Sequence, residues 1–128
     1  MQAQAVISPT LELVHTDARG EIYRVVIGDR ELMLHRSVAG ALRGGHSHDY
    51  DEQVLLLTGK MRYWKLRYGQ ERTFVLEAGM GSLNPAGEVH LGEFLEDSWL
   101  IEWKIGPRIG EGKTTNYEPY RSRVKTSI

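Results

Sequence analysis

Short apolar runs, interrupted by polar residues and glycines, fill most of the chain. Residues 21–27 (EIYRVVI) and 31–38 (ELMLHRSV) flank a Gly-Asp pair, which is typical of a β-hairpin. Further strands are predicted at residues 11–14, 54–57, 60–68, 72–79 and 98–105. We find no convincing helical period over eleven residues or more. The pattern therefore predicts an all-β protein with about eight to ten short strands in a sandwich or barrel.

The last predicted strand, residues 98–105 (SWLIEWKI), alternates clearly. One face carries Trp99, Ile101, Trp103 and Ile105, and the other carries Leu100, Glu102 and Lys104. Because successive side chains of a strand point to opposite faces, one of these two faces must lie in the core. We expect the tryptophan face to point inward, with Trp99, Ile101 and Trp103 as walls that exclude water, and with ordinary core packing for Ile101 and Trp103.

The length of 128 residues suits one compact domain with a core and is too short for two comfortable ones. We expect a single domain over residues 1–128, with its core at about 20–106. Residues 107–128 are polar and rich in basic side chains, so we expect an extended arm there. This arm and the strand-like N-terminus are plausible elements of exchange in a homodimer.

Charge and composition narrow the possible partners. Sixteen basic and seventeen acidic residues give a formal net charge of -1, so no global field favours nucleic acid or an anionic membrane. The sequence has no cysteine, so a metal would be held by histidine, carboxylate or water. The N-terminus lacks a basic start with a long apolar core, and no apolar run approaches membrane-spanning length. A soluble cytoplasmic protein that binds a small molecule is the expectation.

Two histidines stand two residues apart in the stretch GALRGGHSHDYDEQVLLLTG, residues 40–59. In an extended segment His46 and His48 project from the same face and converge on one point, as metal coordination requires. Glu52 can return a carboxylate toward that point, and His90 lies on what would be a neighbouring strand. Imidazoles and a carboxylate suit Mn, Fe, Co, Ni, Cu or Zn. Solvent-exposed or hydrogen-bonded histidines are the common alternative, and we expect that for His15 and His35, although His35 could still line a pocket.

The same stretch resembles the first motif of the cupins, in which glycines flank a His-x-His pair and a glutamate. Every position fits, through Gly40, His46, His48, Glu52 and Gly59. The second cupin motif fits through Gly79, Pro85, Gly87 and His90, whereas Phe94 stands where the family has an asparagine. The resemblance implies a small jelly-roll β-barrel whose metal ligands are His46, His48, Glu52 and His90.

A second resemblance, on shorter motifs, competes with the first. TDARGE (16–21) followed by LRGGHSH (42–48) is similar to the nucleotide-sugar epimerases and 3,4-ketoisomerases, and Gln53 matches a glutamine of the ketoisomerases. That family has a cupin-like fold and works without a metal, using histidine as acid or base beside a carbonyl. Glu52 belongs to the metal pattern and Gln53 to the metal-free one, and alternation lets only one of them face the cavity squarely. We favour Glu52.

Three functions remain open from the sequence. The favoured one is a metal-dependent enzyme of dioxygenase, isomerase or lyase type that acts on a small polar substrate with a carboxylate or carbonyl group. In it, Arg43 would contact an anionic group of the substrate and Tyr63 would donate a proton. The others are the metal-free sugar-nucleotide enzyme and a non-catalytic cupin that binds a metabolite or sugar.

Overall fold

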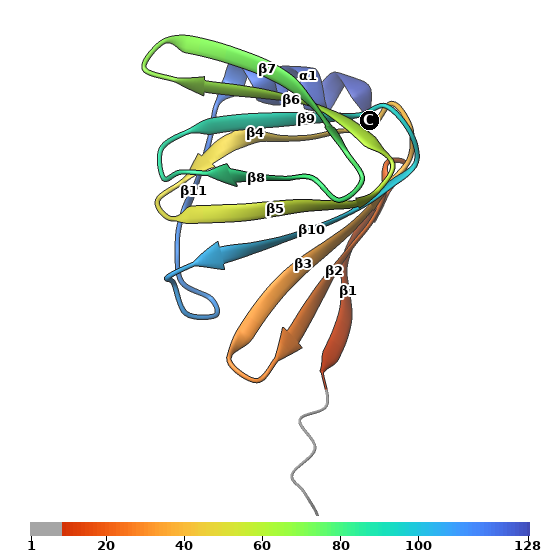
Figure 1. Cartoon of the computed structure of the whole chain (residues 1–128), viewed down its shortest axis with the longest axis vertical. Helices are drawn as coiled ribbons and strands as arrows, with labels where there is room; N and C mark the ends of the chain where they lie inside the picture. Colours follow the sequence, from red (N-terminus) through yellow and green to blue (C-terminus); the bar gives the residue numbers. More distant parts are fainter. Residues whose placement is uncertain (1–8) are drawn as a thin grey trace, which may run out of the picture.

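The computed structural model describes residues 9–128, which form two antiparallel sheets and a short helix (Figure 1). The elements are β1 (Thr10–Asp17), β2 (Gly20–Ile27), β3 (Arg30–Ser37), β4 (Leu42–His48), β5 (Asp51–Thr58), β6 (Lys60–Arg67), β7 (Gln70–Glu77), β8 (Gly81–Asn84), β9 (Val89–Phe94), β10 (Ser98–Ile105), β11 (Thr114–Asn116) and α1 (Glu118–Ser127). The predicted all-β fold and the hairpin at Gly28-Asp29 are confirmed.

The strands do not pair in sequence order. One sheet has six strands in the order β1-β2-β3-β10-β5-β8, and the other has five in the order β11-β4-β9-β6-β7. Strand β10 inserts between β3 and β5, so that Leu100 lies opposite His35 on one side and Leu56 on the other. Such crossing connections are typical of a jelly roll, which has its core between the two sheets.

The inner faces of the two sheets form the core. Its buried apolar members are Ala41, Val54, Leu56, Met61, Tyr63, Leu76, Phe94 and Leu100. On β10 the inward face is therefore the one that carries Leu100 and Glu102. The prediction that Trp99 and Ile101 point inward is wrong. Trp103 shares their register on the strand but borders the cavity described below, as predicted. Apolar content could not decide the question, because the inner face of β10 carries a polar site residue and the outer face is almost wholly apolar.

The C-terminal segment departs from the prediction of an extended arm. Strand β11 pairs with β4, and α1 packs on the outer face of the five-stranded sheet. Tyr120 and Val124 of the helix are buried there together with Leu91 of β9. The helical pattern escaped detection because only two of its ten residues are buried, and a narrow apolar stripe gives a weak period. Within residues 9–128, no helix is long and apolar enough to cross a membrane.

Candidate metal centre

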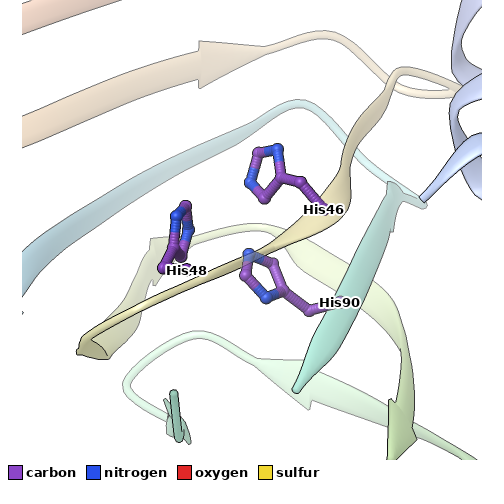
Figure 2. A group of neighbouring side chains, drawn as sticks. All are labelled: His46, His48 and His90. Carbon is purple, nitrogen blue, oxygen red and sulfur yellow. The ribbon is translucent and has the colours of Figure 1, made fainter. Parts of the chain in front are cut away.

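Three histidine side chains point toward one another in the interior (Figure 2). His46 and His48 come from β4 and His90 comes from β9, where His46 and His90 are register partners. One ligand atom from each lies within 4.8 Å of those of the other two. A bulge between Gly44 and His46 makes this approach possible, and Gly44 has φ +100. A Cβ atom at Gly44 would lie 2.8 Å from the carbonyl oxygen of His90, so only glycine fits.

Glu52 of β5 adds a carboxylate to this histidine cluster. One of its oxygens lies 3.4 Å from Nε2 of His48, and the other lies 3.6 Å from Nε2 of His90. Glu52 is 5% exposed, and the side-chain amide of Asn84 donates a 3.1 Å hydrogen bond to Oε1. Gln53 faces away from the cluster, and its amide donates to backbone carbonyls at 3.1 and 3.2 Å. Of this adjacent pair, Glu52 therefore faces the interior.

The hydrogen bonds of the histidines leave their Nε2 atoms available. Nδ1 of His48 lies 2.9 Å from the hydroxyl of Thr114, and Nδ1 of His90 lies 3.4 Å from the backbone carbonyl of Glu88. Such contacts fix the ring orientation of metal-binding histidines. Nε2 of His48 is buried without a hydrogen-bond partner in residues 9–128. A buried polar atom left without a partner is costly, and a metal bound to it would remove that cost, so the donor set fits a transition metal.

The protonation of the cluster also suits a cation. Burial, reinforced by repulsion from His48, lowers the pKa of His46 to about 4. Burial and the charge of His46 lower the pKa of His90 to about 3. These imidazoles are therefore neutral at pH 7, which is the form that binds metals. Burial raises the pKa of Glu52, and Glu102 adds to the effect. A bound cation would act in the opposite direction and favour the ionised carboxylate.

A cavity of about 290 Å³ adjoins the cluster. Its walls include Ile22, Glu31, Met33, His35, His46, His48, Tyr50, Glu52, Glu102, Trp103, Lys104 and Thr114. Nε2 of His35 lies 2.9 Å from a carboxylate oxygen of Glu102. Burial would raise the pKa of Glu102, but the charge of His35 and this hydrogen bond outweigh burial and lower it. The ring of Tyr50 stacks on His48 with centroids 4.7 Å apart.

Sequence reasoning did not identify Thr114, Asn84 or Glu102 as parts of the site. Thr114 and Glu102 are far in sequence from the histidines that they contact, and no local pattern connects them. The only sequence signal for Glu102 was that it is the single carboxylate in the predicted strand at residues 98–105. His35, expected to be an ordinary histidine that could still line a pocket, does line the cavity.

The two predicted catalytic residues lie outside the cavity wall. Arg43 is buried on β4, where Nε donates a 2.7 Å hydrogen bond to the hydroxyl of Ser37. Burial lowers the pKa of Arg43 to about 10. The hydroxyl of Tyr63 accepts a 2.8 Å hydrogen bond from Asn84, the residue that also donates to Glu52. Burial raises the pKa of Tyr63, so the phenol keeps its proton.

The two facing sheets with a histidine cluster between them define a cupin fold, and solved structures confirm it. The capsular polysaccharide assembling protein CapF from Staphylococcus aureus matches with a TM-score of 0.66 and 21% identity, over 76% of this chain and 28% of that chain. Oxalate decarboxylase from Bacillus subtilis at pH 4.6 matches with a TM-score of 0.63 and 20% identity, over 77% of this chain and 27% of that chain. Vicilin from Corylus avellana (hazelnut) matches with a TM-score of 0.68 and 13% identity, over 81% of this chain and 34% of that chain.

These matches establish a cupin jelly-roll fold for this chain. Their sequence identities, at most 21%, carry the fold alone. The chain spans only about a third or less of the length of the proteins that it matches. One further matching structure of the Bacillus subtilis enzyme concerns its Mn(II) centers. Searches of protein-family models and of curated proteins gave no match.

Proposed function

We propose that this chain binds a divalent transition metal and is an enzyme that acts on a small polar substrate with a carbonyl or carboxylate group. The observation that carries the proposal is the convergence of three imidazoles, with ligand atoms within 4.8 Å of one another, beside the Glu52 carboxylate. Nitrogen and oxygen donors of this kind suit Mn, Fe, Co, Ni, Cu or Zn. The cavity of about 290 Å³ beside them is at the small end of ligand sites, which favours a small metabolite.

The bound metal would supply Lewis acidity toward a substrate oxygen, or reactivity with dioxygen if it is iron, manganese or copper. His46, His48, His90 and Glu52 would hold it. The neighbouring groups of the chain orient this set and move protons. Asn84 bridges Glu52 and Tyr63 through two hydrogen bonds, so we assign Tyr63 a positioning role through Asn84.

His35 and Glu102 form the proton-transfer pair of the proposed site. Both line the cavity, and their 2.9 Å hydrogen bond lets a proton on the imidazole be exchanged with a substrate oxygen or carbon while the carboxylate stabilises the imidazolium. Lys104 lies at the same cavity, 5.2 Å from the ring centroid of Tyr50. Its ammonium group donates a 2.6 Å hydrogen bond to the backbone carbonyl of Glu111 and would also attract a substrate carboxylate, the role that the sequence predicted for Arg43.

The orientation of Gln53 disfavours the alternative function, a metal-free enzyme that acts on a nucleotide sugar. Its side chain lies on the outer face of β5 and binds backbone carbonyls, whereas the resemblance to the ketoisomerases needs it at the cavity. A non-catalytic metabolite-binding protein would share the metal site. It would differ by having all coordination positions filled by protein atoms.

The test is the metal content of untagged protein, measured by elemental analysis. We expect about one metal per wild-type chain and almost none in the His48→Ala, His90→Ala double variant. A His15→Ala variant is the matched control, because the side chain of His15 is 49% exposed, lies outside the histidine cluster and contacts Asp17. It should keep its metal.

Wild-type protein without metal, even after refolding with each candidate ion, would contradict the proposal. Stabilisation of that protein by thymidine diphosphate in a thermal-shift assay would then support the metal-free alternative. For the metal-loaded protein, water relaxation at a paramagnetic ion measures whether a coordination position is open. A closed position would contradict the enzyme and support the binding protein.

A further inference from the structure

Strands β3 and β10 pair over only part of their lengths. Their register pairs end at Glu102 and Met33. Beyond this point, residues 30–32 of β3 and residues 103–105 of β10 are not paired with each other, and the two strands diverge (Figure 1). The backbone groups on these two facing edges are therefore not used in the ladder that joins the strands.

A groove of about 1020 Å³ occupies the space where these strands diverge, and we call it the outer groove. One wall comes from the tip of the β2–β3 hairpin, between residues 27 and 32. The other wall comes from the end of β10 and the loop that follows it, between residues 103 and 109. Glu31, Trp103 and Lys104 line both the outer groove and the smaller cavity beside the histidines. The two spaces therefore adjoin at these three residues.

Hydrogen bonds hold the loop after β10 in place as one wall of the outer groove. Nζ of Lys104 donates to the backbone carbonyl of Glu111, and the Glu111 carboxylate accepts a 2.8 Å hydrogen bond from the backbone N–H of Arg108. Gly112 lies so close to Tyr50 that a Cβ atom there would come within 2.5 Å of the ring. Tyr50 lines the smaller cavity, so the loop rests on a residue of the candidate site. This wall is therefore formed without a ligand.

The charge that lacks a partner in the outer groove is positive. Both carboxylates of the groove lie near an arginine, Glu31 at 3.6 Å from Arg24 and Asp29 at 4.0 Å from Arg30. Within residues 9–128, the guanidinium group of Arg108 has neither an ion pair nor a hydrogen bond. A free guanidinium group matches a carboxylate, which it binds through two parallel hydrogen bonds. The groove therefore favours a ligand that carries a carboxylate.

Apolar side chains form much of the remaining wall. Ile27 is 44% exposed and Ile109 is 41% exposed, and Leu32 and Trp103 are half-buried. A ligand in the groove would cover these side chains and remove apolar surface from water. Ligand sites typically combine such walls with a few polar groups that fix the orientation of the ligand. The groove therefore suits a molecule with an apolar body as well as a carboxylate.

We propose that the outer groove binds the distal part of the substrate and that the substrate is an elongated organic acid. Its carboxylate binds Arg108 and is attracted by Lys104, its apolar body lies against Trp103, and its reacting end enters the smaller cavity. The smaller cavity of about 290 Å³ then has to hold only the reacting end. This inference rests on the proposed function for the reaction, whereas binding of an organic acid to the groove can be measured separately.

The test is NMR of the tryptophan indole N–H groups in the full chain, titrated with phenylbutyrate and with its neutral analogue phenylbutanol. Trp103 lines the outer groove, whereas Trp64 lies on the other sheet beside α1. The indole signal that is lost in Trp103→Phe identifies Trp103. We expect phenylbutyrate to shift this signal and not that of Trp64. It should bind roughly 5-fold or more tightly than phenylbutanol, because only the acid can pair with the guanidinium group.

Variants of Arg108 test the contact with the carboxylate. Arg108→Gln removes the charge, so the preference for phenylbutyrate over phenylbutanol should disappear, whereas Arg108→Lys should keep part of it. Arg67→Gln is the matched control, because Arg67 lies on β6 of the other sheet and contacts the ring of Tyr68. It should keep the full preference. The indole signals also verify that each variant is folded.

Three results would overturn the proposal. The first is a Trp103 signal that phenylbutyrate does not shift. The second is an equal preference for the acid in wild type and Arg108→Gln, because the carboxylate would then bind elsewhere. The third is a response that appears only after removal of residues 1–8. That result would make the N-terminal segment the occupant of the groove, since β1 begins at Thr10, opposite Val26 near the tip of the hairpin.

Metal analysis of the same samples separates this inference from the proposed function. Protein that holds a metal but shows no response at Trp103 would contradict the outer groove alone. Protein that never holds a metal but responds at Trp103 and loses its preference in Arg108→Gln would contradict the proposed function alone.

Discussion

Glu52 and Gln53 are sequence neighbours that β5 places in opposite environments. Glu52 faces two histidines and Asn84, and Gln53 lies on the outer face of the sheet. Alternation along a strand explains why only one of them can be part of the site. Their adjacent positions therefore provide a matched pair of substitutions for measuring the role of each side chain.

Replacing Glu52 with glutamine removes the negative charge and keeps a similar shape. We expect metal affinity to fall by at least about 10–100-fold, the range that is seen even for residues that only support the ligands of a metal. Gln53→Ala should leave the affinity unchanged. Competition titration with a chromogenic chelator measures both values. Equal affinities in wild type and Glu52→Gln would show that the carboxylate is not a ligand.

Asp17 makes a pH-dependent contribution to stability away from the metal centre. Hydrogen bonds from Arg19 lower the pKa of Asp17 below its ordinary value of 3.8, although partial burial opposes the shift. A carboxylate whose pKa is lower in the folded state stabilises the protein above the pKa of the unfolded chain. That stabilisation is lost as the pH falls through the folded-state value.

We therefore expect Asp17→Asn to be less stable than wild type by about 1 kcal/mol at pH 7. The difference should shrink as the pH is lowered from about 5 to about 2. Urea unfolding at several pH values measures it. Asp29→Asn serves as the control, because the side chain of Asp29 is 99% exposed, and it should unfold like wild type. A constant difference across this pH range would contradict the proposed role of the Arg19 contact.

Helix α1 contributes stability through a small set of buried contacts. Val124 is 0% exposed, whereas the side chain of the neighbouring Lys125 is 64% exposed. We expect Val124→Ala to lower the free energy of unfolding by about 2 kcal/mol, through lost burial and the cavity that remains. Lys125→Ala should change it by less than about 0.5 kcal/mol. Thermal and urea unfolding distinguish the two. Equal effects would show that the helix is not docked.

The strands and the histidine cluster with Glu52 were predictable because they rest on local patterns. Alternation over four to eight residues marks a strand, and the two cupin motifs each place their histidines within a short segment. The orientation of β10 was not predictable from apolar content, because its outer face is the more apolar one and only the paired strands place Leu100 and Glu102 inward. Asn84 and Thr114 were not predicted as site residues for a related reason. Each contributes through a hydrogen bond that forms only when the strands are paired, Asn84 with Glu52 and Thr114 with His48.

For the whole molecule, the two faces of the six-stranded sheet differ in what they carry. The inner face of the six-stranded sheet supplies His35, Glu52 and Glu102 to the cavity. The outer face carries a row of apolar side chains that includes Tyr23, Leu34, Ile101 and Leu55. Three residues of β10, namely Glu102, Trp103 and Lys104, line the cavity, so substitutions at these positions are expected to affect the site directly.

The position of β10 between β3 and β5 also has a consequence for the order in which the chain can fold. Neither β3 nor β5 can complete its hydrogen bonding until β10 inserts between them, and β10 is made last of the three. Pairing of strands far apart in sequence closes long loops and makes folding slow. His35 and Glu102 come together only in that step, so a ribosome-bound chain that ends before residue 98 cannot contain a complete cavity. A metal that binds earlier would meet His46, His48, Glu52 and His90 alone.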